Sequence, residues 1–546
     1  MSDQSDAVII GSGINGLVAA ALLARIGWRV TVLERNSEPG GLIATEELTV
    51  PGYRHDTFSC WHGMFLAGPV WPLLARDLTA RGIRYSAATG AVSATVRGTG
   101  TAALLYRDQR ETAKHLSVHD GQSYLAELKR IGALTEPLGR IMTANGLVDA
   151  FGAAFASSLF RIGLRGLLPH ARDAVSSLYA WAHRTFDEPD VEALLAPWLL
   201  HAGMTPDSAG GCWTALLMAA GLHRHGAPVL QGGSSRLVAA LCDLISEHGG
   251  RIVTATEATE IRPVGKGVND VIAGGRVVRA NRAVLASTSP AALYLGLLAG
   301  LPTVDLASRE QAARYRPGRA AMQIHVALKA PMRWRDNRLD AVPIVHLCDG
   351  GASVRLACAQ AEAGMLPAQP TIVVGQPYVL DPTRVPDGCG LLWIQLQELP
   401  RVPTADAAGE IDDLGAWDQQ IAERYADRVI SLISVHAPDV SELTVGRAVL
   451  SPADLQRRDI NLVGGDPYGG SAELDQALLF RPFPQFHAHR TPVRGVWHIG
   501  ASTHPGPGLS GASGYAVAAR LAGGRRRLAF RLGVTNNGVT PSGRLG

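Results

Sequence analysis

Three glycines near the N-terminus have a spacing that suits phosphate chemistry. Gly11, Gly13 and Gly16 form the pattern G-x-G-x-x-G. In this pattern the first glycine permits a tight turn, the second lets the backbone approach a pyrophosphate, and the third allows a helix to pack closely on a strand. Glu34 ends the next apolar run and can accept hydrogen bonds from a ribose. These residues predict a dinucleotide-binding site.

A second cluster of small residues lies near the C-terminus, in the run GASTHPGPGLSGASG at residues 500–514. The run leads into a predicted helix at residues 515–521. A glycine-rich loop before a helix again permits close backbone approach and directs free N–H groups at a polar ligand. We therefore expect this loop to contact the same dinucleotide.

The elements that must position the first motif are recognisable around it. Residues 7–10 form an apolar run typical of a buried parallel strand. Residues 17–26 form an Ala- and Leu-rich helix that Gly27 ends, and residues 29–33 form a second strand. This order of strand, glycine loop, helix and strand is what a dinucleotide-binding unit requires.

The same sheet is predicted to continue in distant parts of the chain. A helix at residues 236–248 is followed by a strand segment at 251–261, a hairpin-like excursion and a return strand at 282–286. Residues 496–500 would add the last strand. The domain is therefore predicted to be discontinuous in sequence.

The remaining segments are predicted to form a second domain. Residues from about 70 to 226 are predicted to be mainly helical. Beyond residue 294, strands are predicted at 321–328, 371–374 and 390–396, with a helix at 417–436. This mixture predicts an α+β substrate-binding domain.

Composition excludes several classes of protein. The chain has 546 residues, enough for two domains with their own cores, and its net charge of +3 gives no case for nucleic acid. The 6 cysteines are scattered without C-x-x-C, which indicates reduced thiols and a cytoplasmic protein. No His, Cys or Asp cluster has the spacing of a metal site, so we expect none. Neither a signal peptide nor a membrane span is predicted.

Several motifs together resemble those of a flavoprotein family. They are Glu38-Pro39-Gly40-Gly41, the C-terminal run above, the segment DPTRVPDG at 381–388, and Gly469-Gly470-Ser471 ahead of Arg481-Pro482. The chain resembles the FAD-dependent phytoene desaturase and carotenoid isomerase group. Within the amine oxidase superfamily this is the phytoene dehydrogenase-like branch, also labelled pyridine nucleotide-disulfide oxidoreductase domain-containing. The resemblance implies FAD rather than NAD as the cofactor.

The resemblance also implies a fold and its division along the chain. We expect an α/β fold with a Rossmann-like, discontinuous FAD-binding domain at residues 1–75, 226–293 and 487–530. An α+β substrate-binding domain would comprise residues 76–225 and 294–486, and residues 531–546 would form a tail. The predicted FAD contacts are Gly11, Gly13, Ile14, Asn15, Gly16, Glu34, Arg35, Gly40, Gly41, Leu42, Ala258, Gly500, Ala501, Gly508, Leu509, Gly511 and Ala512.

Four side chains are candidates for contact with flavin or substrate. His504 lies within the C-terminal motif, where the alternative is a role in loop geometry. His62 follows the glycine-pair loop, where the alternative is a packed aromatic cluster. Gln323 and His325 are two residues apart on a predicted strand and so share a face. Amine oxidases place a Lys near the flavin, and the matching position here falls near Gln323, which makes amine oxidation less favoured.

These expectations combine into a predicted function. The chain is expected to be an FAD-dependent oxidoreductase that desaturates a C–C bond of an apolar or ring-containing small molecule by hydride transfer to flavin N5. The alternatives are an FAD-dependent amine oxidase, a flavin-dependent isomerase or saturase without net oxidation, and a flavin-stabilised binding protein without turnover. The basic segment at residues 525–531 predicts either a solvated face or peripheral contact with anionic lipid.

Overall fold

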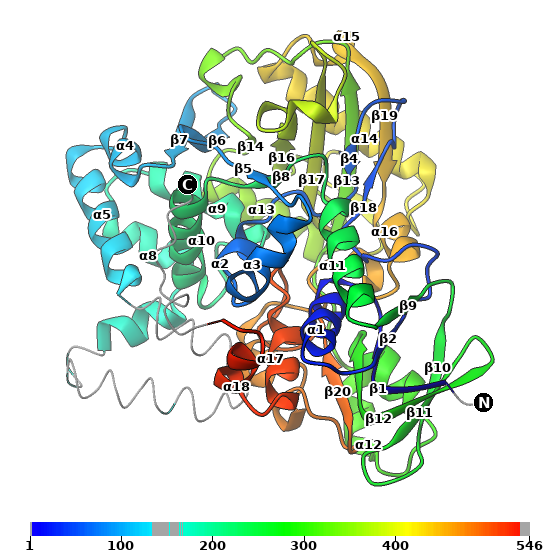
Figure 1. The fold of residues 1–546 in the computed structure, drawn as a ribbon. Coiled ribbons are helices and arrows are strands. Elements are labelled where there is room, and N and C mark those ends of the chain that lie inside the picture. Colours follow the sequence, from blue (N-terminus) through cyan, green and yellow to red (C-terminus); the bar gives the residue numbers. More distant parts are fainter. Residues whose placement is uncertain are drawn as a thin grey trace.

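The first of two large sheets is built around the N-terminal strand β1 (Asp3–Ile10). The computed structural model describes residues 3–133, 168–486 and 488–534, together with Gly152, Gly163 and Arg165. Within these residues, two sheets of seven strands each lie one above the other in Figure 1, with helices between and around them.

The first sheet draws its strands from distant parts of the chain. β1 pairs in parallel with β2 and β12, β2 pairs in parallel with β9, and β12 pairs in parallel with β20. The antiparallel strands β10 and β11 extend it beyond β12. The bounds are β2 Val30–Leu33, β9 Arg251–Val253, β10 Ala258–Pro263, β11 Asn269–Ala273, β12 Arg276–Ser287 and β20 Val496–Ile499. The predicted α/β fold with a Rossmann-like sheet is confirmed, while the exact domain boundaries stay predictions.

Helix α1 (Ile14–Arg25) is the centre of this domain. Its residues Gly16 to Ala24 are buried, because α11 (Ser235–Glu247) and α17 (Ala512–Leu521) pack against it. The approach is close: a Cβ added at Gly514 would lie 1.9 Å from the Asn15 carbonyl oxygen. Small residues on α1 and α17 therefore bring the C-terminal helix beside the N-terminal motif.

The second sheet has the strand order β19-β13-β17-β16-β14-β6-β7. Its bounds are β6 Ala91–Val96, β7 Ala102–Tyr106, β13 Ala320–Leu328, β14 Ile344–Leu347, β16 Ile372–Gly375, β17 Gly390–Leu399 and β19 Thr444–Leu450. One face packs on α14 (Gln419–His436) through a cluster that includes Leu392, Ile394 and Leu396 of β17. Because side chains alternate along a strand, Trp393, Gln395 and Gln397 point to the other face.

Residues 70–226 are mainly helical in the part that the structure describes, as predicted, but three short strands in this stretch were not predicted. The strands β5 (Tyr85–Ser86), β6 and β7 lie in this stretch. The sequence AVSATV of β6 combines small and β-branched residues, which suit a strand buried between neighbours. The helices that follow, α8 (Leu178–Thr185), α9 (Asp190–Leu200) and α10 (Gly211–His225), share a core with the second sheet.

The chain contains further α-helices and short strands. They are α2 Gly63–Ala67, α3 Trp71–Ala80, α4 Gln109–Lys114, α5 Val118–Gly132, α12 Leu306–Ala313, α13 Gly351–Glu362, α15 Val440–Leu443, α16 Pro452–Arg458, α18 Arg525–Arg531 and the strands β3 Thr45–Glu46, β4 His55–Asp56, β8 Val229–Leu230, β15 Met365–Leu366 and β18 Ala405–Asp406. Of the predicted tail, residues 535–546 lie outside the described residues.

A buried cluster of three charges joins segments from both halves of the molecule. Arg384 is fully buried and donates to Asp56 at 2.7 Å, to Asp381 at 3.0 Å and to the carbonyl of Leu230 at 2.8 Å. Asp381 also accepts from the N–H of Gly232, and Asp56 from the N–H of Ser234. The motif at residues 381–388 therefore ties the second sheet to the loop that begins α11.

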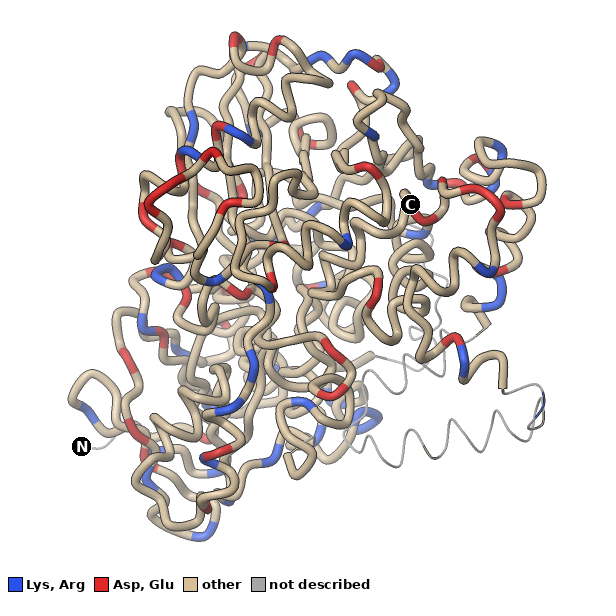
Figure 2. The backbone as a smooth tube through the Cα atoms, turned by 180° about the vertical axis from the view of Figure 1, so that it is seen from behind, with Lys and Arg blue, Asp and Glu red and all other residues tan. Residues whose placement is uncertain are grey.

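Charges of both signs are interspersed along the chain. Figure 2, which traces the backbone from behind the view of Figure 1, shows positions of Lys and Arg alternating with those of Asp and Glu. Among the described helices, none has the length and apolar character needed to cross a bilayer.

We expect Arg384→Met to destabilise the fold strongly, because it leaves two buried carboxylates without their shared cation. Breaking a buried pair in this way costs about 3–5 kcal/mol of unfolding free energy. Arg316→Met is the control, since Arg316 pairs with Asp475 at the surface, where such pairs contribute about 0–1 kcal/mol. Urea unfolding measures both, and equal losses would contradict the role given to Arg384.

Candidate functional site

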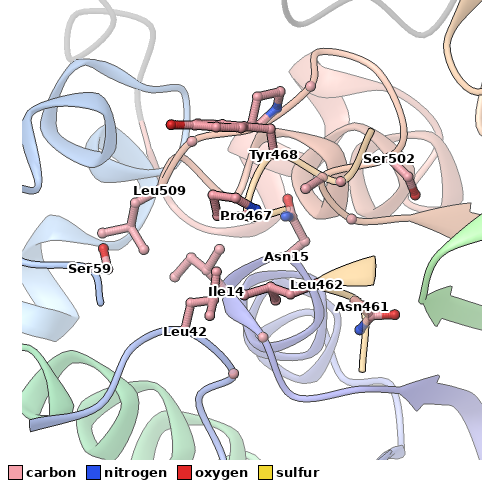
Figure 3. A pocket seen from close by; sticks show the side chains of 18 of the residues that line it. Ile14, Asn15, Leu42, Ser59, Asn461, Leu462, Pro467, Tyr468, Ser502 and Leu509 are labelled. Atoms are coloured by element: carbon pink, nitrogen blue, oxygen red, sulfur yellow. The ribbon is translucent and has the colours of Figure 1, made fainter. Parts of the chain in front are cut away.

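A large cavity lies between the two sheets. Its volume is about 1190 Å³, and its walls come from the β1–α1 turn, the segment after β2, the loop at residues 459–481, the C-terminal loop, α10 and β17. Figure 3 shows Ile14, Leu42 and Leu462, from three distant segments, lying around one space. Ligand pockets commonly have volumes of about 300–1,000 Å³, so the space can hold a dinucleotide together with a small substrate.

The β1–α1 turn forms one end of this cavity. Gly13 precedes α1, and a Cβ built there meets nothing within 4 Å, so the backbone is open to a ligand. Gly16 has the opposite surroundings: a Cβ would lie 2.1 Å from the Gly11 carbonyl oxygen, so this glycine permits the helix to pack on the strand. Both observations match the roles that a dinucleotide fingerprint requires.

Glu34 is held at the end of β2 by hydrogen bonds. Its carboxylate accepts from the N–H of Ser12 at 2.9 Å, the hydroxyl of Ser12 at 2.7 Å and the N–H of Asn36 at 2.9 Å. Its exposed fraction is 7%, and the residue lines the cavity. A fixed, buried carboxylate beside the glycine turn is suited to accepting from ribose hydroxyls.

The glycine pair lies against the same turn. Gly40 donates its N–H to the Ser12 hydroxyl at 3.2 Å. A Cβ at Gly41 would lie 3.3 Å from the Cα of Gly13 and 3.4 Å from a carboxylate oxygen of Asp459. Burial raises the pKa of the Asp459 carboxyl. Asp459 also lines the cavity, and sequence reasoning did not single it out.

The C-terminal loop contributes to the cavity with its first part. Gly500, Ala501, Gly508 and Leu509 line the space, but Gly511 and Ala512 do not. A Cβ at Gly511 would lie 2.7 Å from a methyl group of Val18, so this glycine permits α17 to pack on α1. The other predicted FAD residues that line the cavity are Gly11, Gly13, Ile14, Asn15, Glu34, Arg35, Gly40, Gly41, Leu42 and Ala258.

Buried Arg481 holds the loop at residues 466–481 against the C-terminal loop. Arg481 donates to the carbonyls of Ala501 at 3.0 Å and Tyr468 at 2.7 Å, and to three further carbonyls of residues 469–476. Asp466, in the same loop, accepts from the N–H groups of Gly318, Tyr468 and Gly470, each at 2.7 Å. The Arg481 guanidinium and the Asp466 carboxylate are thus both hydrogen-bonded to backbone groups of the protein.

The opposite end of the cavity is apolar and aromatic. α9 and α10 contribute Trp198, Trp213, Leu217, Met218 and Leu222, and β17 contributes Trp393, Gln395 and Gln397. His201 and His225 also line this end, and burial lowers the pKa of each to about 4. Both imidazoles are therefore neutral near pH 7, and the described residues of this end present rings and amides instead of charges.

The predicted catalytic histidines do not line the cavity. His62 is buried between Tyr85 and Ser234, at 3.1 and 3.0 Å from their hydroxyls, and burial lowers its pKa to about 4. His504 is also buried, while its neighbours Pro505 and Gly506 line the space. The packed-cluster alternative therefore describes His62 better than a catalytic role.

Gln323 and His325 are also set back from the cavity. Both are fully buried on β13, and His325 lies 3.2 Å from the carbonyl oxygen of Thr57. Their strand partners on β17 are Gln395 and Trp393, which do line the space. The predicted face is the correct one, but β17 lies beside the cavity and β13 is one strand further away.

The residues present fit FAD. The open backbone at Gly13, the fixed carboxylate of Glu34, the glycine pair and the C-terminal loop all border one continuous cavity. The glycine turn with α1 would hold the pyrophosphate, Glu34 the ribose, and the C-terminal loop the flavin part.

Comparisons with known proteins place these features in a wider group. A family model of flavin containing amine oxidoreductases matches residues 14–392. Rattus norvegicus pyridine nucleotide-disulfide oxidoreductase domain-containing protein 2 is 29% identical over 94% of this chain and 92% of its own length. A neurosporene-forming phytoene desaturase of Cereibacter sphaeroides is 25% identical over 95% of each chain. The crystal structure of an oxidoreductase from Methanosarcina mazei matches 94% of this chain and 99% of its own, with a TM-score of 0.61 at 16% identity.

We expect Glu34→Gln to weaken FAD binding about tenfold to a hundredfold, the effect of losing a hydrogen bond to a charged group. The amide also presents N–H groups where Ser12 and Asn36 donate. Glu257→Gln is the control, because Glu257 lines the same cavity but is exposed. Flavin release on dilution, followed by fluorescence, gives both affinities. Equal affinities in the two variants would refute the assignment of Glu34.

Proposed function

This chain belongs to the flavin containing amine oxidoreductase family, and we propose that within this family it desaturates a C–C bond of an apolar or ring-containing small molecule. The chain is an FAD-dependent oxidoreductase. When bound, FAD supplies the acceptor for the hydride that leaves the substrate. The proposal that the reacting bond is a C–C bond of an apolar molecule depends on the end of the cavity formed by α9, α10 and β17, here called the substrate end.

The observation that carries the proposal is the character of that end. Among the residues that the structure describes, the charged ones that line the cavity are Glu34, Arg35, Glu257, Asp459, Asp466 and Arg481. None of them comes from α9, α10 or the second sheet, and Asp466 and Arg481 are engaged with backbone. Trp198, Trp213 and Trp393 provide flat apolar surfaces there. Such walls bind apolar rings and exclude water from the reacting carbon.

The similarity over whole chains supports the same reading. The phytoene desaturase relative is matched over nearly its full length, and its name describes a desaturation. The alternative, oxidation of an amine, is supported by the name of the family. A carboxylate is the strongest partner for a protonated amine, and the described lining of the substrate end contains none.

Anaerobic titration of the FAD-loaded protein tests the proposal. We expect apolar ring compounds to bleach the oxidised flavin absorbance and amines of the same carbon skeleton to leave it unchanged. Bleaching by amines alone would contradict the proposal and favour an amine oxidase. Bleaching by dithionite but by neither class would favour a flavin-stabilised binding protein, or an isomerase or saturase without net oxidation. A return of absorbance with oxygen would show that the bound flavin was intact.

A further inference from the structure

A row of side chains crosses the cavity face of the second sheet. In the strand register, Gln323 on β13 lies opposite Gln395 on β17, and Gln395 lies opposite Val373 on β16. Val373 in turn lies opposite His346 on β14. Directly opposed residues of antiparallel strands project to one face, so the row spans three strand spacings, about 14 Å.

Gln395 is the member of this row that meets the cavity with a free amide. Its exposed fraction is 4%, and it lines the cavity. Its side-chain amide has no hydrogen-bond partner within the described chain. Protein atoms do not cover this amide completely, so it is accessible from the cavity. The amide of Gln323 is also unpartnered, but it is sealed from the cavity. A buried amide without partners costs free energy unless water or a ligand supplies them.

His346 adds a second polar side chain to the row, and its imidazole is also uncharged. Its Nε2 lies 3.2 Å from Nε2 of His201, which lines the cavity and stacks on Trp198 with 4.8 Å between ring centroids. One imidazole donates to the other, which requires only neutral rings. Burial lowers the pKa of His201 to about 4 and that of His346 well below its usual range. The cavity-lining groups, Gln395 and the His201 ring that His346 contacts, are thus uncharged and provide no counter-ion to a cation.

We infer that the substrate is a neutral molecule with an apolar body and one hydroxyl or carbonyl oxygen, and that the Gln395 amide binds this oxygen. The inference rests on the proposed function, since it describes the substrate of the same site. The Nε2–H group of Gln395 donates to the oxygen, and Oε1 accepts from a hydroxyl. Trp393, two residues earlier on the same face, lies beside the ring or chain that carries the oxygen.

Three probes with one carbon skeleton test the inference: limonene, perillyl alcohol and perillylamine. Each is titrated without oxygen into the FAD-loaded protein whose flavin has first been reduced with dithionite, so that the flavin accepts no hydride, and the dissociation constant is taken from the heat of binding. We expect the wild type to bind the alcohol about threefold to tenfold more tightly than the hydrocarbon, the effect of one neutral hydrogen bond. The amine, which is protonated at neutral pH, should bind more weakly than the hydrocarbon.

Two variants locate the effect. Gln395→Leu should abolish the preference for the alcohol and keep the affinity for the hydrocarbon, which also shows that the variant is folded. Gln323→Leu removes the neighbouring amide of the same row and should keep the preference. The inference is overturned if Gln395→Leu keeps the preference, if Gln323→Leu loses it, if the amine binds most tightly, or if the alcohol does not saturate the wild type.

The binding experiment is independent of turnover. A protein that shows the expected affinities but whose flavin no apolar compound bleaches would refute the proposed function alone. A protein whose flavin is bleached by ring hydrocarbons, without a preference that depends on Gln395, would refute this inference alone.

Discussion

The buried contact of Arg384 with Asp56 and Asp381 is the constraint on which the site depends. The cavity lies between two sheets that come from different segments, so its shape follows from how these segments are held together. Arg384 bonds at once to the N-terminal segment, to its own loop and to the strand before α11. Because all three charges are buried, any shift between the segments would expose or unpair a charge, which is costly.

The N-terminal half of the cofactor site could be predicted from sequence because its residues act through backbone geometry that local spacing reveals. Gly11, Gly13, Glu34 and the glycine pair all border the cavity where the motif placed them. The roles of the individual glycines in the C-terminal motif could not be predicted as well. Gly508 lines the cavity but Gly511 packs on Val18, and no local pattern distinguishes a glycine that makes room for a ligand from one that makes room for a helix.

The substrate end could not be predicted because it depends on which strand of a sheet borders the cavity. Gln323 and Gln395 carry the same signal, a glutamine within an apolar strand, and they lie opposite each other on one face. Strand order, which one sequence does not reveal, places β17 at the cavity and β13 one strand away. Asp459 and Arg481 were missed for a similar reason, since their neighbours come from segments far apart in the chain.

The two ends of the cavity differ in their electrostatics, and this difference connects the fold to the chemistry. Charged residues and open backbone gather at the glycine turn, where a dinucleotide carries its phosphates and ribose. Aromatic rings, amides and neutral imidazoles gather between α10 and β17. A crystal structure of the FAD-loaded protein with perillyl alcohol tests this account most directly. It should show FAD running from Glu34 to the loop at residues 500–509, with the alcohol against Trp393 and its oxygen at Gln395. FAD in that position with the alcohol bound away from β17, or FAD filling the space between α10 and β17, would contradict the account.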